Sequence, residues 1–409
     1  MNGKTEGDIQ SGAVPDHVPP HLVKHFDFRT GLADRPQEII ARLHEGPPIF
    51  YSPVRHTMGS GAGMWVITRA SDIRAVMSAP EVFSSSIQGE FLAAIGETIR
   101  LTPLDADPPL HGRFRALLNP LFTPKRMVEL ETLIRARCAA LINRFEHRRS
   151  CEFIAEFATQ FPTGVFIDLM GLPGERLDLF VGWAREFIHG ETAERRIAAV
   201  RQIVDYFRAL YLMRDGYGDD SILAYLLGRS EGVSLTEDEF CSLAFLLFSA
   251  GLDTVVSSLG FIFRFLAENE HPQSRLRADR KHIPRHVEEM MRLFAPVTPQ
   301  RIATRDTVLS GVAIRKGDCL ALSLAAASRD PAEFPDAGSF HAERNPNPHF
   351  AFGYGPHRCI GAQLARRNIA IAVEEWLTRL PPFRLAPDQQ IVATGGSVLS
   401  LDGLSLVWG

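Results

Sequence analysis

The amino-acid sequence predicts a mainly α fold (α-rich α+β), with a large helical part and a small β-rich part. Three observations support this prediction. Between residues 107 and 294, apolar residues recur almost throughout at helical spacing. Strand-like stretches occur only before and after that region. No repeat period and no low-complexity linker divides the 409 residues, so we expect one large unit.

The N-terminal residues 1–28 form a polar arm with several prolines and no apolar stretch of signal-peptide length. Residues 29–409 are predicted to form a single domain. Near its start, residues 35–45 read as an amphipathic helix, and two strand-like stretches follow at 48–54 and 64–68.

Three glycines, Gly59, Gly61 and Gly63, separate those two stretches. A dinucleotide-binding loop must lie between a strand and a helix, whereas here a strand-like stretch follows. The glycines therefore predict a hairpin turn.

The long helical region begins at Asp107, because the two prolines that follow are tolerated in a first helical turn. Thr123 is the expected N-cap of a helix over 124–147. Further helices are predicted at 154–170, 174–189, 191–214, 221–229, 236–267 and 284–294.

The most apolar segment, residues 241–267, is long enough to span a bilayer. Asp253 near its middle would cost about 2.5–3.5 kcal/mol in a membrane, and Arg264 lies near its end. We therefore interpret the segment as a helix buried in the core and expect no membrane association.

The elements after residue 294 are shorter. Strand-like segments (TVLSGVAI and CLALSLAA) occur between 297 and 345, and a glycine-containing loop at 350–357 leads into a helix over 359–380. The chain ends in the strand-like stretch LSLVWG.

The composition excludes several classes of protein. Hydrophobic residues make up 45% and charged residues 22% of the chain, which argues against a disordered or collagen-like protein. A net charge of −4 provides no basic field for nucleic acid, so we expect none as a partner. The five cysteines, with no CxxC pair, are typical of reduced thiols in a cytoplasmic protein.

The strongest motif is FGYGPHRCIG at 352–361. It places Cys359 at the start of a predicted helix, where the N–H groups and the helix dipole favour a thiolate. His357 and Arg358 add positive character, and Gly355 and Gly361 leave space for a flat cofactor. Taken alone, Cys359 also fits an incidental cysteine after a glycine-rich turn.

The pattern F-x-x-G-x-H-x-C-x-G resembles the haem-thiolate loop of the cytochrome P-450 superfamily. The resemblance implies haem b (iron protoporphyrin IX) as the cofactor and Cys359 as its metal ligand. It also implies the P-450 fold, with the haem between a distal helix that carries Asp253 and a proximal helix after the cysteine. The loop residues that the resemblance assigns to cofactor binding are Phe352, Gly355, His357, Cys359 and Gly361.

Glu289 and Arg292 lie three residues apart and can share a helix face. The spacing is weak by itself, since Glu146 and Arg149 also fit it. Because the first pair precedes a proline-bearing turn and lies upstream of the cysteine loop, it resembles the family's buried Glu-Arg pair, with Arg344 as its third partner. The implied role is structural, holding the loop beneath the haem.

The stretch Ala250-Gly251-Leu252-Asp253-Thr254 in the apolar helix matches the family's oxygen-binding pattern A-G-x-D-T. The resemblance implies that Ala250 and Gly251 leave room for the co-substrate O2, that Thr254 hydrogen-bonds it and that Asp253 relays protons. A plainer interpretation stays open: Thr254 bonds back to the Ala250 carbonyl, and Asp253 lies in a core ion pair.

A cationic set completes the match. His111 and Arg115 are four residues apart in D-P-P-x-H-x-x-x-R and share a helix face. The resemblance makes both of them contacts of the haem propionates, with Arg301 as a third cation. Each alone also fits a solvated basic residue.

The stretches AGLDTVV, EEWLTRLP and the terminal LVW look most like the bacterial camphor hydroxylase group. That group binds its substrate ketone with a tyrosine before the D-P-P helix. This chain has no tyrosine between Phe83 and Asp107, and Ile99 falls near the expected position. We therefore expect a small apolar terpenoid or norisoprenoid (ionone-like) substrate, with camphor or another monoterpene as the alternative.

Eight residues are expected to line the substrate pocket, and each also fits ordinary core packing: Phe91, Leu92, Ile99, Leu247, Ser249, Ala250, Val297 and Val398.

The predicted function is haem-dependent monooxygenation of an unactivated C–H bond with O2 and two electrons. The resemblance implies that a [2Fe–2S] ferredoxin with an NADH-dependent ferredoxin reductase supplies the electrons. The predicted ferredoxin-docking residues are Arg113, Arg358, Arg366 and Arg367, which also fit a solvated basic face. A non-catalytic haem-binding sensor and a peroxide-using enzyme are the alternatives, and the Asp253–Thr254 pair disfavours both.

Overall fold

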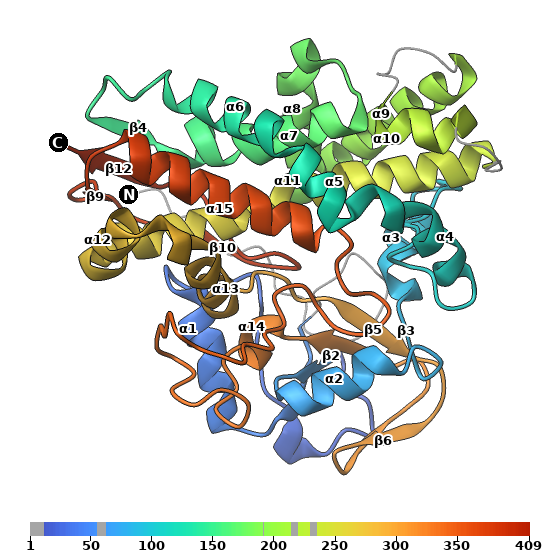
Figure 1. The fold of residues 1–409 in the computed structure, drawn as a ribbon. Helices are drawn as coiled ribbons and strands as arrows, with labels where there is room; N and C mark the ends of the chain where they lie inside the picture. Colours follow the sequence, from blue (N-terminus) through green and yellow to red (C-terminus); the bar gives the residue numbers. More distant parts are fainter. Residues whose placement is uncertain (1–11, 55–62, 191, 214–219, 230–234) are drawn as a thin grey trace.

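The computed structural model describes residues 12–54, 63–190, 192–213, 220–229 and 235–409, without the side chains of 88–91, 188, 189 and 229. Figure 1 shows a helical part and, beside it, a β-rich part that holds the largest sheet, with α15 crossing between them. The turn predicted at Gly59 and Gly61 lies outside the described residues. The division into an arm and a single domain stays a prediction.

The helices of the structure confirm a mainly α fold. The α-helices are α1 (Pro36–Ala41), α2 (Ala70–Ser78), α3 (Glu90–Ala94), α4 (Leu110–Leu118), α5 (Pro124–Glu129), α6 (Glu131–Ile142), α7 (Gln160–Met170), α8 (Leu177–His189), α9 (Ala193–Met213), α10 (Ile222–Ala224), α11 (Glu237–Glu268), α12 (Glu270–Ala278), α13 (Ile283–Leu293), α14 (Leu324–Ala327) and α15 (Ala362–Arg379).

Shorter helical turns connect them. The 3₁₀ turns are η1 (Pro20–Leu22), η2 (Arg42–Glu45), η3 (Ser86–Gly89), η4 (Asn119–Phe122), η6 (Gly174–Arg176) and η8 (Arg280–His282), and the π-helical turns are η5 (Ile154–Ala158) and η7 (Tyr225–Arg229).

Several predicted boundaries need correction. The helix expected over 124–147 is two helices that meet at Leu130, and the second ends at Ile142. The helix expected to start at Cys359 begins at Ala362. The helices α2 and α12 were not predicted, because their polar first turns hide the apolar residues that they bury, such as Ile73 and Leu276.

The long apolar segment is α11, and its N-terminus carries a capping box. Thr236 Oγ1 accepts the N–H of Glu239 (3.2 Å), and the Glu239 carboxylate accepts the N–H of Thr236 (3.1 Å). By length and composition α11 could cross a membrane, yet 67% of its most apolar window is buried within the protein. That burial fits the expected core helix.

The β-rich part contains a five-stranded sheet with the order β1-β2-β8-β5-β3. Its strands are β1 (Ile49–Ser52), β2 (Met64–Ile67), β8 (Cys319–Leu322), β5 (Gln300–Ala303) and β3 (Phe83–Ser84). In this register Arg301 lies opposite Leu320 and Ile302 lies opposite Ser84. The sheet therefore brings Arg301 close to the segment that follows β3.

The remaining strands form three small sheets. These are β4 (Ser150–Glu152), β12 (Ser405–Trp408) and β9 (Phe383–Leu385); β6 (Thr307–Leu309) with β7 (Val312–Ile314); and β10 (Ala393–Thr394) with β11 (Ser400–Leu401). One large apolar cluster fills the helical part, and two smaller clusters lie around the five-stranded sheet.

Candidate functional site

The cysteine loop is a tight turn seated on α2. Gly355 has a φ of +68°, and a Cβ there would lie 2.3 Å from the Met77 carbonyl oxygen, so only glycine fits. The N–H of Cys359 donates to the carbonyl of Phe352 (2.9 Å). Local sequence and tertiary contact together fix where the thiol lies.

The thiol of Cys359 lies three residues before the first residue of α15, with Gly361 as the N-cap. Burial of its sulfur raises the pKa of Cys359, against a backbone N–H bond from Gly361 and the charges of Arg115, Arg358 and Arg366. The residue is nevertheless exposed. The Gly361 N–H and the three arginines, rather than a first helical turn around the cysteine, are thus the groups that oppose the effect of burial on this thiol.

Two histidines and two arginines gather beside the loop from three parts of the chain. The rings of His111 (α4) and His357 are in contact, with centroids 4.2 Å apart and planes tilted by 48°. Arg115 (α4) donates to the carbonyl of Arg358 (2.9 Å), and Arg301 on β5 is 2% exposed. The structure therefore brings together the propionate contacts that the sequence predicts.

The electrostatics of this set point to an anionic partner. Burial, with the charges of Arg301, His111 and Arg115, lowers the pKa of His357 to about 3. Burial also lowers the pKa of Arg301 to about 10. Within the described residues, neither Arg115 nor Arg301 forms an ion pair with a carboxylate. A buried charge without a counter-ion is costly, so an anion at this place would be strongly favoured.

A buried network lies beneath the loop. The Glu289 carboxylate accepts hydrogen bonds from Arg292 (2.8 Å twice), Arg344 (3.1 and 3.2 Å) and Asn347 (3.1 Å), and from the backbone N–H of His341. Glu289 and Arg292 are 1% and 0% exposed. The three residues predicted to act together are in contact, and their hydrogen bonds join α13 to residues 337–347.

The residues of the A-G-x-D-T stretch lie midway along α11. Ala250 is exposed although the residues just before it are buried, so it borders open space. Thr254 Oγ1 donates to the Ala250 carbonyl at 3.3 Å, which is long for a hydroxyl bond. The structure therefore contains the hydrogen bond from Thr254 back to Ala250 that the plainer interpretation predicts, although the bond is weak.

Gly251 also has a role in helix packing. A Cβ on this residue would lie 2.7 Å from the ring of Phe166 on α7. The glycine is therefore required where α11 packs on α7, and its role in leaving room for O2 stays a prediction.

The expected substrate residues lie on different elements, and their shared pocket stays a prediction. Leu92, Ile99 and Leu247 are buried in the large apolar cluster, and Val297 forms an isolated β-bridge with Val398. The hydroxyl of Ser249 donates to the carbonyl of Phe245 (2.9 Å) within its own helix. The side chain of Phe91 lies outside the described ones.

The predicted ferredoxin-docking cluster also needs correction. Arg113 pairs with Glu239 (2.5 Å), Arg366 with Glu288 (2.5 Å) and Arg367 with Glu131 (2.9 Å). Their charges are neutralised internally. Arg358 is exposed and forms no ion pair with a described residue.

Sequence reasoning missed three contacts of the loop. Ser85 Oγ and His357 Nε2 are hydrogen-bonded (3.1 Å), Met77 seats Gly355, and Glu288 binds both His349 and Arg366. Only tertiary structure brings these residues together. The adjacency of Glu288 to Glu289 was the one available signal.

The donor set fits a haem. Among the described side chains no three His, Cys, Asp or Glu residues gather as a metal site, so Cys359 would be a single thiolate ligand. His111, Arg115, His357 and Arg301 would hold the two propionates. A single thiolate beside two arginines and two histidines, with an acid–alcohol pair on a buried helix, defines a haem-thiolate protein.

Comparison with known proteins agrees. The Cytochrome P450 family model matches residues 189–393. A probable cytochrome P450 127A1 of Sinorhizobium fredii is 40% identical over 98% of both chains. The mycinamicin IV hydroxylase/epoxidase of Micromonospora griseorubida is 33% identical over 87% of this chain and 91% of its own. The solved structure of CYP101C1 matches with a TM-score of 0.86 and 28% identity, over 97% of this chain and all of that one.

The chain belongs to the cytochrome P450 family and has the P450 fold. It is accordingly a P450 monooxygenase, an oxidoreductase with a Cys-ligated haem that uses O2.

Proposed function

We propose that this P450 hydroxylates an unactivated C–H bond of a small apolar terpenoid or norisoprenoid, such as an ionone. Relatives do not supply the substrate: one is named for mycinamicin IV, and another, 31% identical, is a steroid C26-monooxygenase. The proposal therefore rests on this chain's own residues.

The observation that carries it is the segment between α3 and α4. Its polar side chains already have partners: Thr98 donates to Asp238 (3.0 Å), and Arg100 pairs with Asp105 (3.2 Å). Ile99 between them is 2% exposed. Near the position where the camphor hydroxylase group has its substrate-binding tyrosine, this segment therefore presents an apolar side chain and no hydroxyl. Both camphor and ionones are ketones, so recognition by apolar contact alone favours the ionone, which has the larger hydrocarbon body.

When bound, the haem would supply the redox chemistry, in which the substrate, O2, two electrons and two protons yield the hydroxylated product and one water. The chain's own residues do the rest. The weak bond from Thr254 Oγ1 to Ala250 leaves this hydroxyl able to rotate and donate a proton to a bound molecule. Asp253, one residue earlier, is proposed to pass protons toward it.

The electrons are proposed to come from a [2Fe–2S] ferredoxin and an NADH-dependent ferredoxin reductase in the cytoplasm. Arg358, next to the haem ligand and exposed, is the remaining candidate contact for an acidic ferredoxin. Product that forms with ferredoxin and NADH but not with peroxide supports this route, whereas the reverse supports a peroxide-using enzyme. A haem sensor would form no product with either.

The substrate proposal is tested by the low-spin to high-spin spectral shift of the purified ferric protein. We expect β-ionone to give a larger shift than camphor, and the opposite order would contradict the proposal. Ile99→Tyr, which restores a hydroxyl, should raise the camphor response. Ile99→Phe is its matched control, because it changes size but adds no donor.

A further inference from the structure

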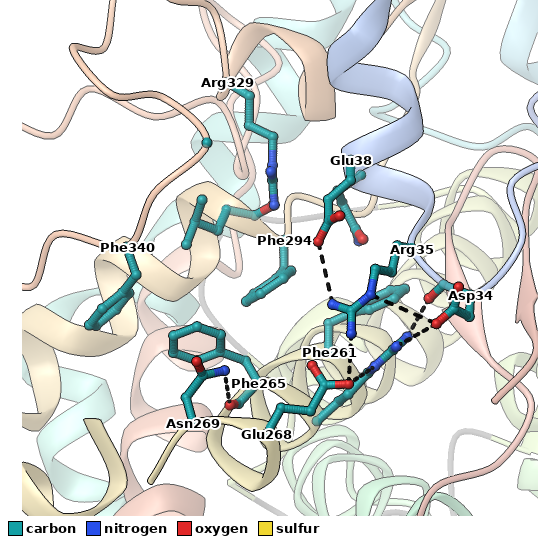
Figure 2. A pocket seen from close by; sticks show the side chains of 14 residues that line it. Asp34, Arg35, Glu38, Phe261, Phe265, Glu268, Asn269, Phe294, Arg329 and Phe340 are labelled. Carbon is teal, nitrogen blue, oxygen red and sulfur yellow. Dashed lines mark hydrogen bonds and ion pairs between the residues drawn. The ribbon is translucent and has the colours of Figure 1, made fainter. Parts of the chain in front are cut away.

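A pocket of about 220 Å³ lies away from the haem site, between α1, the C-terminal part of α11 and the end of α13. Phe261, the pocket residue of α11 nearest to Thr254, is seven residues from it, which separates the pocket from the Asp253–Thr254 pair by about 10 Å along the helix axis. Figure 2 shows that the pocket lining combines phenyl rings, among them Phe265, Phe294 and Phe340, with charged side chains.

The aromatic side is a row of rings. The rings of Phe294 and Phe265 have centroids 5.7 Å apart, and those of Phe265 and Phe340 are 5.0 Å apart. All three are partly buried. A row of this kind favours a flat apolar group.

The charged side is largely self-neutralised. Arg264 pairs with Asp34 (2.7 Å) and Glu268 (3.0 Å), and Arg35 pairs with Glu268 (3.1 Å) and Glu38 (3.4 Å). These acids are therefore already engaged by two arginines (Figure 2).

Arg329 is the exception. It is 6% exposed and lines the pocket, and its Nε donates to the carbonyl of Leu293 (3.0 Å). Its two Nη groups have no hydrogen-bond partner among the described residues. Burial and the charge of Arg292 lower the pKa of Arg329 to about 10, although Glu38 and Glu289 oppose this. Its guanidinium is still charged at neutral pH, and a buried charge of this kind requires an anion.

We infer that this pocket binds a small aromatic carboxylate, with the carboxylate on the Nη groups of Arg329 and the ring against Phe294 and Phe340. A guanidinium presents two parallel N–H groups to a carboxylate, which matches the two open Nη positions. Nothing in the proposed oxygenase chemistry requires this site, so the inference stands separately from it.

The test uses the haem-loaded enzyme with 4-phenylimidazole on the iron, which keeps the probe out of the haem site. Benzoate is titrated by calorimetry, with benzamide as the uncharged probe of equal shape. We expect saturable one-to-one binding of benzoate, at least about tenfold tighter than that of benzamide. Equal affinity for the two probes, or no saturable binding of benzoate, would overturn the inference.

Two variants sharpen the test. Glu38→Gln removes an exposed negative charge near Arg329 and should tighten benzoate binding about twofold without changing benzamide; Glu45→Gln, outside the pocket, is its control. Arg329→Lys keeps the charge but loses the two-pronged geometry, and should weaken benzoate about tenfold. Benzoate affinity unchanged by both variants would place the anion elsewhere and refute the assignment.

Discussion

The two sides of the haem site are built differently. On the cysteine side (residues 349–361 with Glu288, Glu289 and Arg292), the carboxylates of Glu288 and Glu289 each accept hydrogen bonds from at least two side chains. On the helix side (residues 250–254 with the segment 92–107), the hydroxyls of Thr254 and Ser249 bond only to carbonyls of their own helix.

The difference indicates a division of labour. Charged, multiply bonded groups fix a ligand in one position, whereas weakly bonded hydroxyls can change partners during a reaction. Substitutions on the cysteine side should therefore lower stability and haem content. Substitutions of the hydroxyls on the helix side should alter chemistry and leave stability unchanged.

The largest effect is expected for Arg292→Ala. It leaves the Glu289 carboxylate buried without its main counter-ion, which costs about 3–5 kcal/mol. Absorbance of the haem relative to protein should show protein without haem, and denaturant unfolding should show the loss of stability. Arg285→Ala, which breaks an exposed pair with Glu343, is the control and should cost at most about 1 kcal/mol. Normally haem-loaded Arg292→Ala protein would contradict the structural role.

A smaller loss of stability is expected for Gly251→Ala. This variant lies on the helix side but should lower stability, so it is an exception to the division between the two sides. The added Cβ meets the ring of Phe166 at 2.7 Å, and such overpacking costs about 1–3 kcal/mol. Gly112→Ala on α4 is the control, because a Cβ there meets nothing within 4 Å. Phe166→Leu in the same chain should recover part of the loss. Unchanged unfolding of Gly251→Ala would show that this packing is not tight.

Glu288→Gln tests the cysteine side through pH. Burial alone would raise the pKa of Glu288, but hydrogen bonds from His349 and Arg366 lower it to about 2. A carboxylate with a lowered pKa stabilises the fold above its unfolded value and loses that contribution as pH falls toward the folded value. Wild-type stability should therefore fall between about pH 4.5 and 2 more steeply than that of Glu288→Gln. Parallel curves would refute this role.

The smallest change in stability is expected for Thr254→Ala, within about 0.5 kcal/mol of wild type. Its effect should appear in chemistry, as less hydroxylated product per NADH consumed. Ser258→Ala, one turn along α11, removes a hydroxyl that bonds to the Thr254 carbonyl and is the matched control. Equal coupling in Thr254→Ala and wild type would assign Thr254 to helix packing alone.

The sequence predicted those contacts that depend on residue spacing within one helix or loop. Glu289 and Arg292 share a helix face, and the glycines of the cysteine loop indicate a turn, so the ion pair and the turn could both be predicted. It was less informative where separate elements meet. The packing of Gly251 on Phe166 and the pairing of Arg366 with Glu288 depend on how helices cross, which periodicity does not encode.

The most direct test of the account is the Soret band of the reduced carbon monoxide complex. A thiolate ligand shifts this band to longer wavelength, so wild type and the serine variants of Cys138, Cys151, Cys241 and Cys319 should all show the shift. Cys359→Ser should lose it while still folding. A shifted band in Cys359→Ser would contradict the claim that this residue is the haem ligand.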